Sequence, residues 1–276
     1  MDALIRQVVN LTVPCADDGR RFVCRDRLDR IATELDGSRY VLLDNRPLTY
    51  VYGHMDYNPA KPTVLISNHI DSLYDQYFAR SVDGIIRGTL DNSACNAVAV
   101  DLMKRGALPP QALIAFTGNE EGDSAGVDQT IEVLKTHGST FWNLELAISL
   151  DLTEESYGCS DFTIENYFIE SQHNDALLKF SRERELKTYL SDILTNPTFV
   201  KNGEADESWQ YDEYDLNCFT LCLPCALLGN DMHDDSGVMI RNDSLKAFAS
   251  ALQKVTSGVD KDLANKALHR TANRRR

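Results

Sequence analysis

The sequence predicts an α/β protein, a three-layer sandwich in which helices cover both faces of a mostly parallel central sheet. Two observations predict this fold. Short apolar segments alternate along the chain with segments of helical periodicity. The apolar segments are continuous rather than interrupted at every second residue, which indicates strands buried on both faces. The chain has 276 residues, 43% of them hydrophobic, and is therefore long enough to bury such a core.

Two helices and a strand pair are expected before the alternation begins. The helices cover Met1–Leu11 and Asp18–Leu35, and the second has its apolar residues near helical spacing. The strands cover Arg39–Leu43 and Leu48–Tyr52, with the turn sequence Asp44-Asn45-Arg46-Pro47 between them.

Four units follow, each an apolar strand and then a helix. The predicted strands are Thr63–Ser67, Ala112–Phe116, Leu144–Leu150 and Phe219–Leu223. The predicted helices are Ala94–Met103, Asp123–Thr136, His173–Leu186 and Ser244–Val255. Because no repeat or Gly/Ser linker interrupts the chain, residues 1–256 are expected to form one catalytic domain, with the N-terminal helices (1–36) packed on it. Residues 257–276 are expected to be a disordered basic tail.

The charge distribution limits the partners. The formal net charge is −14, although residues 261–276 carry six basic side chains and one acid. An acidic body disfavours nucleic-acid binding, which depends on phosphate neutralisation, and suits cations or cationic substrates. No run approaches 18 apolar residues, and the N-terminus lacks a signal-peptide pattern. We therefore expect a cytoplasmic protein with no nucleic-acid or membrane partner, and leave the oligomeric state open.

The seven cysteines are read as reduced thiols. Cys218, Cys222 and Cys225 are close in sequence but lie in an apolar run, so they are interpreted as buried small hydrophobic residues rather than a metal cluster. Cys95 is interpreted as helix packing.

Polar residues directly follow the first three predicted strands, a further polar segment lies between the first two strands, and another follows the fourth strand after a loop. The segments are Asn68-His69-Ile70-Asp71, Asp91-Asn92, Asn119-Glu120-Glu121, Asp151 and Met232-His233-Asp234. In an open α/β sheet, sites lie beyond the carboxyl ends of the strands, so these five segments deliver His and carboxylate groups to one edge. Imidazole and carboxylate oxygen are the ligands expected for Zn²⁺, Mn²⁺ or Co²⁺ at a hydrolytic site.

These motifs resemble those of the di-zinc exopeptidases, a superfamily of aminopeptidases, carboxypeptidases and aminoacylases with two co-catalytic metals. The resemblance covers about residues 63–256 and rests on five motifs in family order: His-Ile-Asp, Gly-Thr-Leu-Asp-Asn-Ser-Ala, Gly-Asn-Glu-Glu-Gly, Leu-Asp-Leu and Met-His-Asp-Asp. It implies the zinc-peptidase fold, which is phosphorylase/hydrolase-like. It also implies two divalent metal ions as cofactors, zinc first, with cobalt or manganese as alternatives.

The resemblance also implies a role for each residue. Asp91 would bridge both metals. His69 and Asp151 would complete one site, and Glu121 and His233 the other. Glu120 would be the general base, and Asp71 would orient the His69 imidazole.

Spacing selects a branch of the superfamily. Only 21 residues separate His69 from Asp91, and 81 separate Asp151 from His233. The self-compartmentalising aminopeptidases and the lid-bearing branch insert a further domain at one of these two places. The layout is therefore closest to the single-domain zinc aminopeptidases.

The resemblance implies amide hydrolysis by a two-metal-activated water, with an N-terminal residue of a peptide as the first substrate class. Alternatives are deacylation of N-acyl amino acids, carboxypeptidase-type hydrolysis, glutaminyl cyclase-type transfer and an inactive metal-binding scaffold.

Some side-chain roles stay open. Met232 stands where some relatives have an oxyanion-stabilising Tyr, so Tyr211 or Tyr214 is a candidate donor. Asp206, Glu207 and Asp212 are read as an acidic loop, of which one residue could pair with a substrate α-ammonium. Tyr74, Tyr77 and Phe78 are candidates for a specificity pocket, with ordinary loop packing as the alternative.

Overall fold

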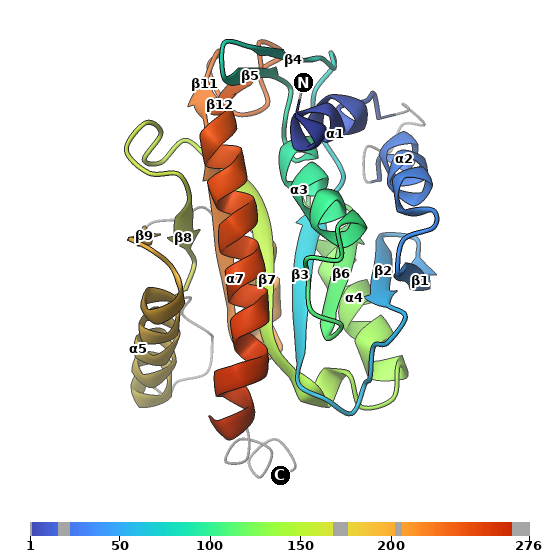
Figure 1. The fold of residues 1–276 in the computed structure, drawn as a ribbon, viewed down its shortest axis with the longest axis vertical. Coiled ribbons are helices and arrows are strands. Elements are labelled where there is room, and N and C mark those ends of the chain that lie inside the picture. Colours follow the sequence, from blue (N-terminus) through green and yellow to red (C-terminus); the bar gives the residue numbers. More distant parts are fainter. Residues whose placement is uncertain (1, 16–22, 168–175, 202–205, 267–276) are drawn as a thin grey trace.

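An eight-stranded sheet forms the middle layer of the molecule (Figure 1). The computed structural model describes residues 2–15, 23–167, 176–201 and 206–266. The sheet has the order β1-β2-β6-β3-β7-β10-β8-β9. Its strands are β1 Tyr40–Arg46, β2 Thr49–His54, β3 Thr63–His69, β6 Ala112–Thr117, β7 Leu144–Thr153, β8 Thr163–Glu165, β9 Thr198–Phe199 and β10 Cys218–Pro224. The predicted three-layer α/β fold with a mostly parallel sheet is confirmed.

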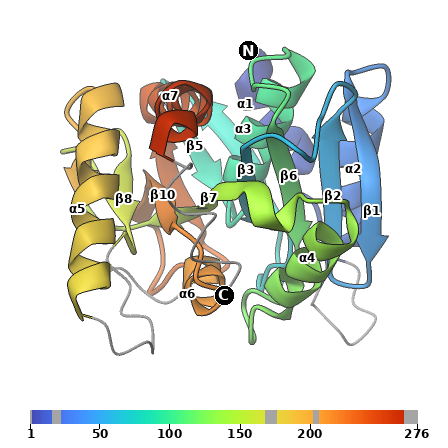
Figure 2. The ribbon, with the colours of Figure 1, turned by 90° about the horizontal axis from the view of Figure 1, so that it is seen from below.

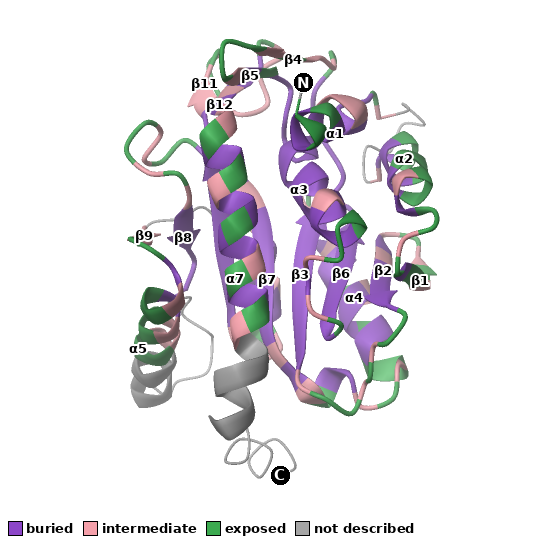
Figure 3. Ribbon diagram, viewed as in Figure 1, coloured by how far each residue is buried: buried purple, intermediate pink, exposed green. Residues whose placement is uncertain are grey.

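The four central strands, β6, β3, β7 and β10, run parallel, so their carboxyl ends meet at one edge. Every residue of β3, β6 and β10 is buried, as the continuous apolar runs predicted. Figure 3 shows β3 and β6 in the colour of buried residues. The register places Ser67 of β3 opposite Ala115 of β6 and Ser149 of β7. His69 and Asp151 lie at the same edge, two residues farther along their strands.

Helices cover both faces of this sheet (Figure 2). The helices of one face are α1 Ala3–Leu11, α2 Arg25–Leu35, α3 Ser93–Lys104 and α7 Asn242–Lys266, and they share one hydrophobic cluster. The other face carries α4 Ala125–Thr136, α6 Glu207–Glu213 and the short 3₁₀ helix η1 Phe141–Asn143, around a second cluster. Helix α5, Ala176–Ile193, contacts α7 beside strands β8 and β9.

Contacts at both ends of α1 and along its apolar face fix this helix on the rest of the protein. The Asp2 side chain accepts a hydrogen bond from the Leu4 amide at 3.2 Å, which caps the helix. Val8 and Leu11 are fully buried within the larger hydrophobic cluster. After the helix ends, the Thr12 hydroxyl lies 2.8 Å from the hydroxyl of Ser93, the first residue of α3. The amphipathic N-terminal segment therefore packs on the same core as the sheet.

A second, smaller sheet was not predicted. Its strands are β4 Ala79–Val82, β5 Ile85–Gly88, β11 Ala226–Leu227 and β12 Val238–Arg241, in the order β11-β12-β5-β4. Strands of two to four residues give too short a pattern for periodicity to detect. Pairing of β5 with β12 places Gly88 opposite Val238, so it joins the chain just before Asp91 to the chain just after His233.

Several helices begin or end at other residues than the sequence predicted. The acidic loop expected at Asp206–Asp212 is wrong, because these residues form the N-cap and body of α6. Helix α2 begins at Arg25, while the start of the predicted helix at Asp18 lies outside the described residues. Likewise, the predicted start of α5 at His173 is not described. Helix α7 continues to Lys266, into the segment expected as a tail. Within the described residues, no helix is both long and apolar enough to span a membrane.

The contact between the two short strands β5 and β12 yields a stability prediction. Gly237 has a φ of +74°, and a Cβ atom there would lie 2.2 Å from the Gly88 carbonyl oxygen. We expect Gly237→Ala to lower the free energy of unfolding by about 2–4 kcal/mol, through left-handed strain plus the clash. Gly106 is the matched control, because its φ is +60° and nothing lies within 4 Å of its Cβ position. Gly106→Ala should cost only about 1–2 kcal/mol in urea unfolding. Equal losses in the two variants would contradict this packing.

Candidate metal centre

The structure brings the predicted His and carboxylate residues together at the carboxyl edge of the sheet. His69 is the last residue of β3, and Glu120 and Glu121 follow β6. Asp151 lies within β7, which is three residues longer than predicted. Asp91 and His233 come from loops joined to the small sheet. Five separate chain segments therefore supply one cluster.

One group of side chains surrounds the His69 imidazole. Its Nε2 lies 3.3 Å from Asp91 Oδ1 and 3.5 Å from Asp151 Oδ1. Burial leaves only 2% of His69 and 5% of Asp91 exposed. His69, Asp91 and Asp151 each offer a ligand atom within 4.8 Å of the others.

A second group surrounds His233. Its Nε2 lies 3.0 Å from Glu121 Oε2 and 3.5 Å from Asp91 Oδ2. Asp91 belongs to both groups, and it faces each with a different carboxylate oxygen. This is the arrangement of a carboxylate that can join two cation sites.

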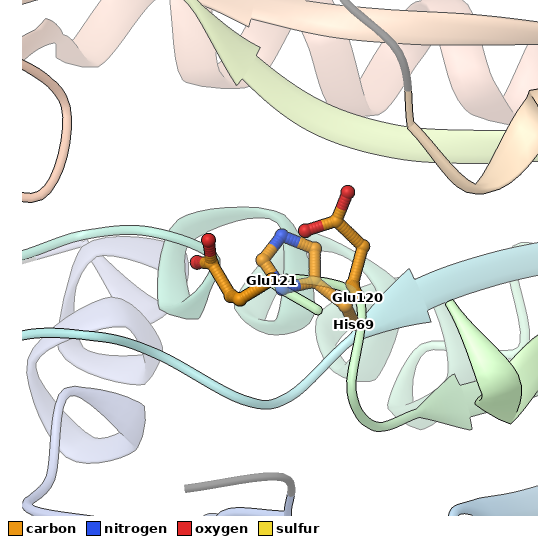
Figure 4. A group of neighbouring side chains, drawn as sticks. All are labelled: His69, Glu120 and Glu121. Carbon is orange, nitrogen blue, oxygen red and sulfur yellow. The ribbon is translucent and has the colours of Figure 1, made fainter. Parts of the chain in front are cut away.

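The two adjacent glutamates lie on either side of His69 and point in different directions (Figure 4). Glu121 faces His233, whereas the Glu120 carboxylate stays near the His69 imidazole. Behind them, Asp71 Oδ2 accepts a hydrogen bond from the Glu121 amide at 3.1 Å, and Asp71 Oδ1 lies 3.5 Å from His69 Nδ1. Asp71 is 1% exposed, and it therefore contacts the His69 imidazole and the Glu121 amide from the side away from the cluster.

The electrostatics of the cluster follow from burying several carboxylates together. Burial, with the neighbouring carboxylates of Asp151 and Glu121, raises the pKa of Glu120 to about 10. Burial also raises the pKa of Asp151 to about 7. Hydrogen bonds to Asp91 and Glu121 raise the pKa of His233 to about 10.

His69 and Asp91 shift in opposite directions. Burial opposes a charge on His69, but the carboxylates of Glu120 and Asp151 outweigh it and raise the His69 pKa well above its usual value. Burial of Asp91 is likewise outweighed by His233 and His69, which lower the Asp91 pKa. Without metal ions, protons held on the imidazoles thus offset the negative charge of the carboxylates in this cluster.

The donor set fits divalent cations. Around a tetrahedral zinc ion with ligands at about 2.1 Å, neighbouring ligand atoms lie about 3.4 Å apart. The four separations between an imidazole nitrogen and a carboxylate oxygen in the two groups are 3.0–3.5 Å. The buried atoms Asp91 Oδ1 and Glu121 Oε1 have no hydrogen-bond partner. Nitrogen and oxygen donors at this spacing suit Zn²⁺, Co²⁺ or Mn²⁺.

A cavity of about 560 Å³ opens onto the cluster. Asp91, Glu120, Glu121, Asp151 and His233 all line it, and His69 and Asp71 lie behind them. The remaining acidic side chains of the wall are Glu154, Glu155, Glu165, Asp206 and Asp231. Among the described residues, no lysine or arginine lines this cavity. Its potential is therefore strongly negative.

The tyrosines that the sequence suggested as oxyanion donors or pocket residues make contacts elsewhere in the structure. Within the described part of the chain, no tyrosine lines the cavity. Tyr211 is fully buried and donates to Ser67 Oγ at 2.8 Å, and Tyr214 donates to Asp128 at 2.7 Å. Tyr74, Tyr77 and Phe78 do not line this cavity, which agrees with the alternative of ordinary loop packing rather than with a specificity pocket. Instead, Tyr74 donates to the Met232 carbonyl at 2.7 Å, one residue before His233. This role could not be predicted, because the acceptor is a distant backbone atom.

Helix α6 supplies two carboxylates that were expected in a loop: Asp206, which is half-buried at the N-cap, and Glu207, which is buried. Asp206 lines the cavity and caps the helix, accepting from the Ser208 amide at 2.7 Å and from Asn166 at 2.9 Å. Glu207 is 2% exposed and lies outside the cavity lining, beside the hydroxyls of Thr117 and Ser67. Burial raises the Glu207 pKa to about 7. When ionised, Glu207 raises the pKa of Glu120 by charge repulsion.

Comparisons with known proteins bear on the fold. No protein-family model and no curated protein matches the sequence. Solved structures do match. An aminopeptidase of the archaeon Desulfurococcus kamchatkensis aligns with TM-score 0.66 at 10% identity, over 91% of this chain and 93% of that one. The chain has the fold of these aminopeptidases.

Two further structures show the same similarity. The TET1 peptidase of Pyrococcus horikoshii, which can assemble into a tetrahedron or a large octahedral shell, aligns with TM-score 0.63 at 11% identity, over 92% and 99% of the two chains. The LapA aminopeptidase of Legionella pneumophila aligns with TM-score 0.59 at 10% identity, over 95% and 71%. The resemblance indicated by the five motifs is thus confirmed at the level of fold.

The raised pKa values predict how metal binding depends on pH. Imidazole must lose its proton to bind a cation, and His233 keeps its proton up to a pH of about 10 in the metal-free protein. Zn²⁺ binding should therefore release protons, and the apparent affinity should increase from pH 6 to pH 8. Titration calorimetry in two buffers of different ionisation enthalpy measures the released protons.

The matched variants for this titration are His233→Ala and His137→Ala. His137 lies outside the cluster and faces Asp44 at 3.5 Å. At pH 7, His233→Ala should release about one proton fewer than the unmodified protein, and His137→Ala should not differ. Affinity independent of pH, or equal proton release in both variants, would show that His233 is not a ligand.

Proposed function

We propose that this protein is a metal-dependent hydrolase that cleaves amide bonds, and specifically an aminopeptidase that removes N-terminal residues from peptides. The observation that carries the proposal is the geometry of Asp91. Its two oxygens face two separate His-carboxylate groups, and an additional carboxylate, Glu120, lies beside them at the cavity. A site that only stores a metal has no use for that extra carboxylate.

The proposed cofactors are two divalent cations, with zinc first. His69 and Asp151 would hold one, Glu121 and His233 the other, and Asp91 would bridge them. When bound, such cations lower the pKa of water and polarise the scissile carbonyl. Asp71 would keep the His69 imidazole oriented, because its carboxylate lies at the ring nitrogen that faces away from the cluster.

Glu120 is the proposed general base. Its carboxylate lines the cavity wall, where the ionised form would take a proton from the attacking water. Burial raises its pKa, so it also retains that proton long enough to pass it to the leaving amine. Two cations next to Glu120 would counter this rise and keep the resting group ionised.

The charge of the cavity favours an aminopeptidase over the alternatives. Glu154, Glu155 and Glu165 add negative charge to the wall beyond the proposed metal ligands. An N-acyl amino acid or a carboxypeptidase substrate brings a free carboxylate, which this potential disfavours. A peptide N-terminus brings an ammonium group, which it attracts. The similar solved structures named as aminopeptidases agree with this choice.

We also propose that the protein works in the cytoplasm on peptide or small amide substrates. All seven cysteines are free thiols, as a reducing compartment would keep them. Cys218, Cys222 and Cys225 are buried, in agreement with their interpretation as small hydrophobic residues.

Substitution of the proposed base tests the mechanism. Glu120→Gln should lower kcat by about 10²–10⁴-fold, because an amide cannot accept the proton, while the bound metal content stays the same. Glu155→Gln is the control, since Glu155 lines the same cavity but lies outside both proposed metal groups. It should lower kcat by less than about tenfold. Similar losses in the two variants would remove Glu120 from the role of base.

A substrate panel tests the reaction class. We expect the zinc-, cobalt- or manganese-loaded protein to release p-nitroaniline from aminoacyl-p-nitroanilides with a free amino group, and not from the N-acetylated compounds. Cleavage of N-acetyl amino acids instead would make the protein a deacylase. Metal binding with no cleavage of any compound would favour an inactive scaffold.

A further inference from the structure

The loop that carries His233 is joined to the loop that follows His69. The first loop comprises residues 228–237, between β11 and β12, and the second comprises residues 70–78, between β3 and β4. Both loops run into the small sheet at one end of the molecule (Figure 1). We propose that Tyr74 and Asp235, one from each loop, are positioning residues that hold the His233 imidazole in place to bind a divalent cation. This inference rests on the proposed metal centre.

The two imidazoles of the centre are held in different ways. His69 ends a buried strand, its side chain is 3% exposed, and Asp71 Oδ1 lies 3.5 Å from its Nδ1. The His233 side chain is 38% exposed and extends from a loop. Among the described residues, no carboxylate forms an ion pair with His233 Nδ1, because both of its ion pairs are made by Nε2. His233 therefore needs other contacts to fix its orientation.

The peptide unit between Met232 and His233 is held at both of its polar atoms. The Tyr74 hydroxyl donates to the Met232 carbonyl at 2.7 Å. On the other side, the His233 amide donates to Asp231 Oδ1 at 3.0 Å. A peptide unit is planar, so two hydrogen bonds on opposite sides fix the plane from which the His233 side chain extends. Tyr74 is 2% exposed, and water therefore competes little for its hydrogen bond.

The ring of Tyr74 also packs against the imidazole that it positions. The two rings meet edge to face, with centroids 6.3 Å apart and planes at 64°. Tyr74 does not line the cavity, so it cannot contact a substrate there. Its influence on the centre is therefore exerted through His233, by a backbone hydrogen bond and by a ring contact.

Asp235 makes the reciprocal contact from the His233 loop. Its Oδ1 accepts hydrogen bonds from the amides of Asp75 at 2.8 Å and Gln76 at 3.0 Å, the two residues that follow Tyr74. Hydrogen bonds to a charged acceptor are stronger than those between neutral groups. Three hydrogen bonds thus join the two loops, and a shift of either loop would strain all three.

The test measures each cation separately. His69→Ala should leave only the ion of the His233 group, and His233→Ala should leave only the ion of the His69 group. Tyr74→Phe keeps the ring and removes the hydroxyl, and it is introduced into both backgrounds and into the unmodified protein. Competition with a chromophoric chelator gives the Zn²⁺ dissociation constants, and thermal melting followed by circular dichroism shows that each protein is folded.

We expect Tyr74→Phe to weaken Zn²⁺ binding about 10–100-fold in the His69→Ala background, because the imidazole loses part of its support. In the His233→Ala background, the same substitution should leave the dissociation constant unchanged. In the otherwise unmodified protein, it should weaken one of the two ions and not the other. A general loss of stability would weaken both ions alike, so the contrast separates positioning from a merely structural role.

Tyr57→Phe is the matched control. The Tyr57 hydroxyl donates to Thr140 at 2.9 Å and lies 3.1 Å from the hydroxyl of Thr63, at the opposite end of β3 from His69. This variant also loses a tyrosine hydroxyl with its hydrogen bonds, but it should change neither dissociation constant.

Asp235 provides a second, independent variant. Asp235→Ala removes the acceptor of two amides and should weaken Zn²⁺ binding in the His69→Ala background, in the same direction as Tyr74→Phe. Asp235→Asn keeps a side-chain oxygen that can accept these hydrogen bonds, and it should restore most of the affinity.

Two results would overturn the inference in a protein that binds two zinc ions. One is an unchanged affinity for both ions in Tyr74→Phe, and the other is an equal weakening of both. Absence of zinc binding by the unmodified protein would instead contradict the proposed metal centre, and this inference with it. Failure of the positioning role alone and failure of the proposed function are therefore distinguishable.

Discussion

The concentration of buried carboxylates at one sheet edge is the constraint on which the site depends. Asp91, Glu121 and Asp151 face only two imidazoles, and Glu120 lies beside them. Burying that much like charge is unfavourable unless cations offset it. Without them, protons stay on the imidazoles and on Glu120, as the raised pKa values show. The same excess makes the cavity attractive to a positively charged peptide end.

The scaffold holds this unfavourable cluster in place by supporting it from three directions. The parallel strands fix His69 and Asp151, which come from adjacent strands. The small sheet joins the loops of Asp91 and His233 through the β5–β12 pairing. Beneath the edge, Tyr211 of α6 is hydrogen-bonded to Ser67 of β3. Rigid strands and short pairings thus position side chains that would repel one another if free.

The central strands and the His-carboxylate cluster could be predicted because strands that are buried on both faces have continuous apolar sequences. Continuous apolar runs identified the parallel strands, and the polar residues after each run identified the cluster. The small sheet and α6 have no comparable sequence pattern, because these elements are short and their partners are distant along the chain. The role of Tyr74 depends on the carbonyl of Met232, 158 residues away.

The most direct test of this account counts bound metal in Asp91→Ala and Asp151→Asn by equilibrium dialysis and elemental analysis. If Asp91 joins two cation sites, the unmodified protein binds two zinc ions per chain and Asp91→Ala retains neither at micromolar zinc. Asp151→Asn, which alters only the His69 group, should retain the ion of the His233 group. One ion in the unmodified protein, or undiminished binding in Asp91→Ala, would contradict the shared-carboxylate centre.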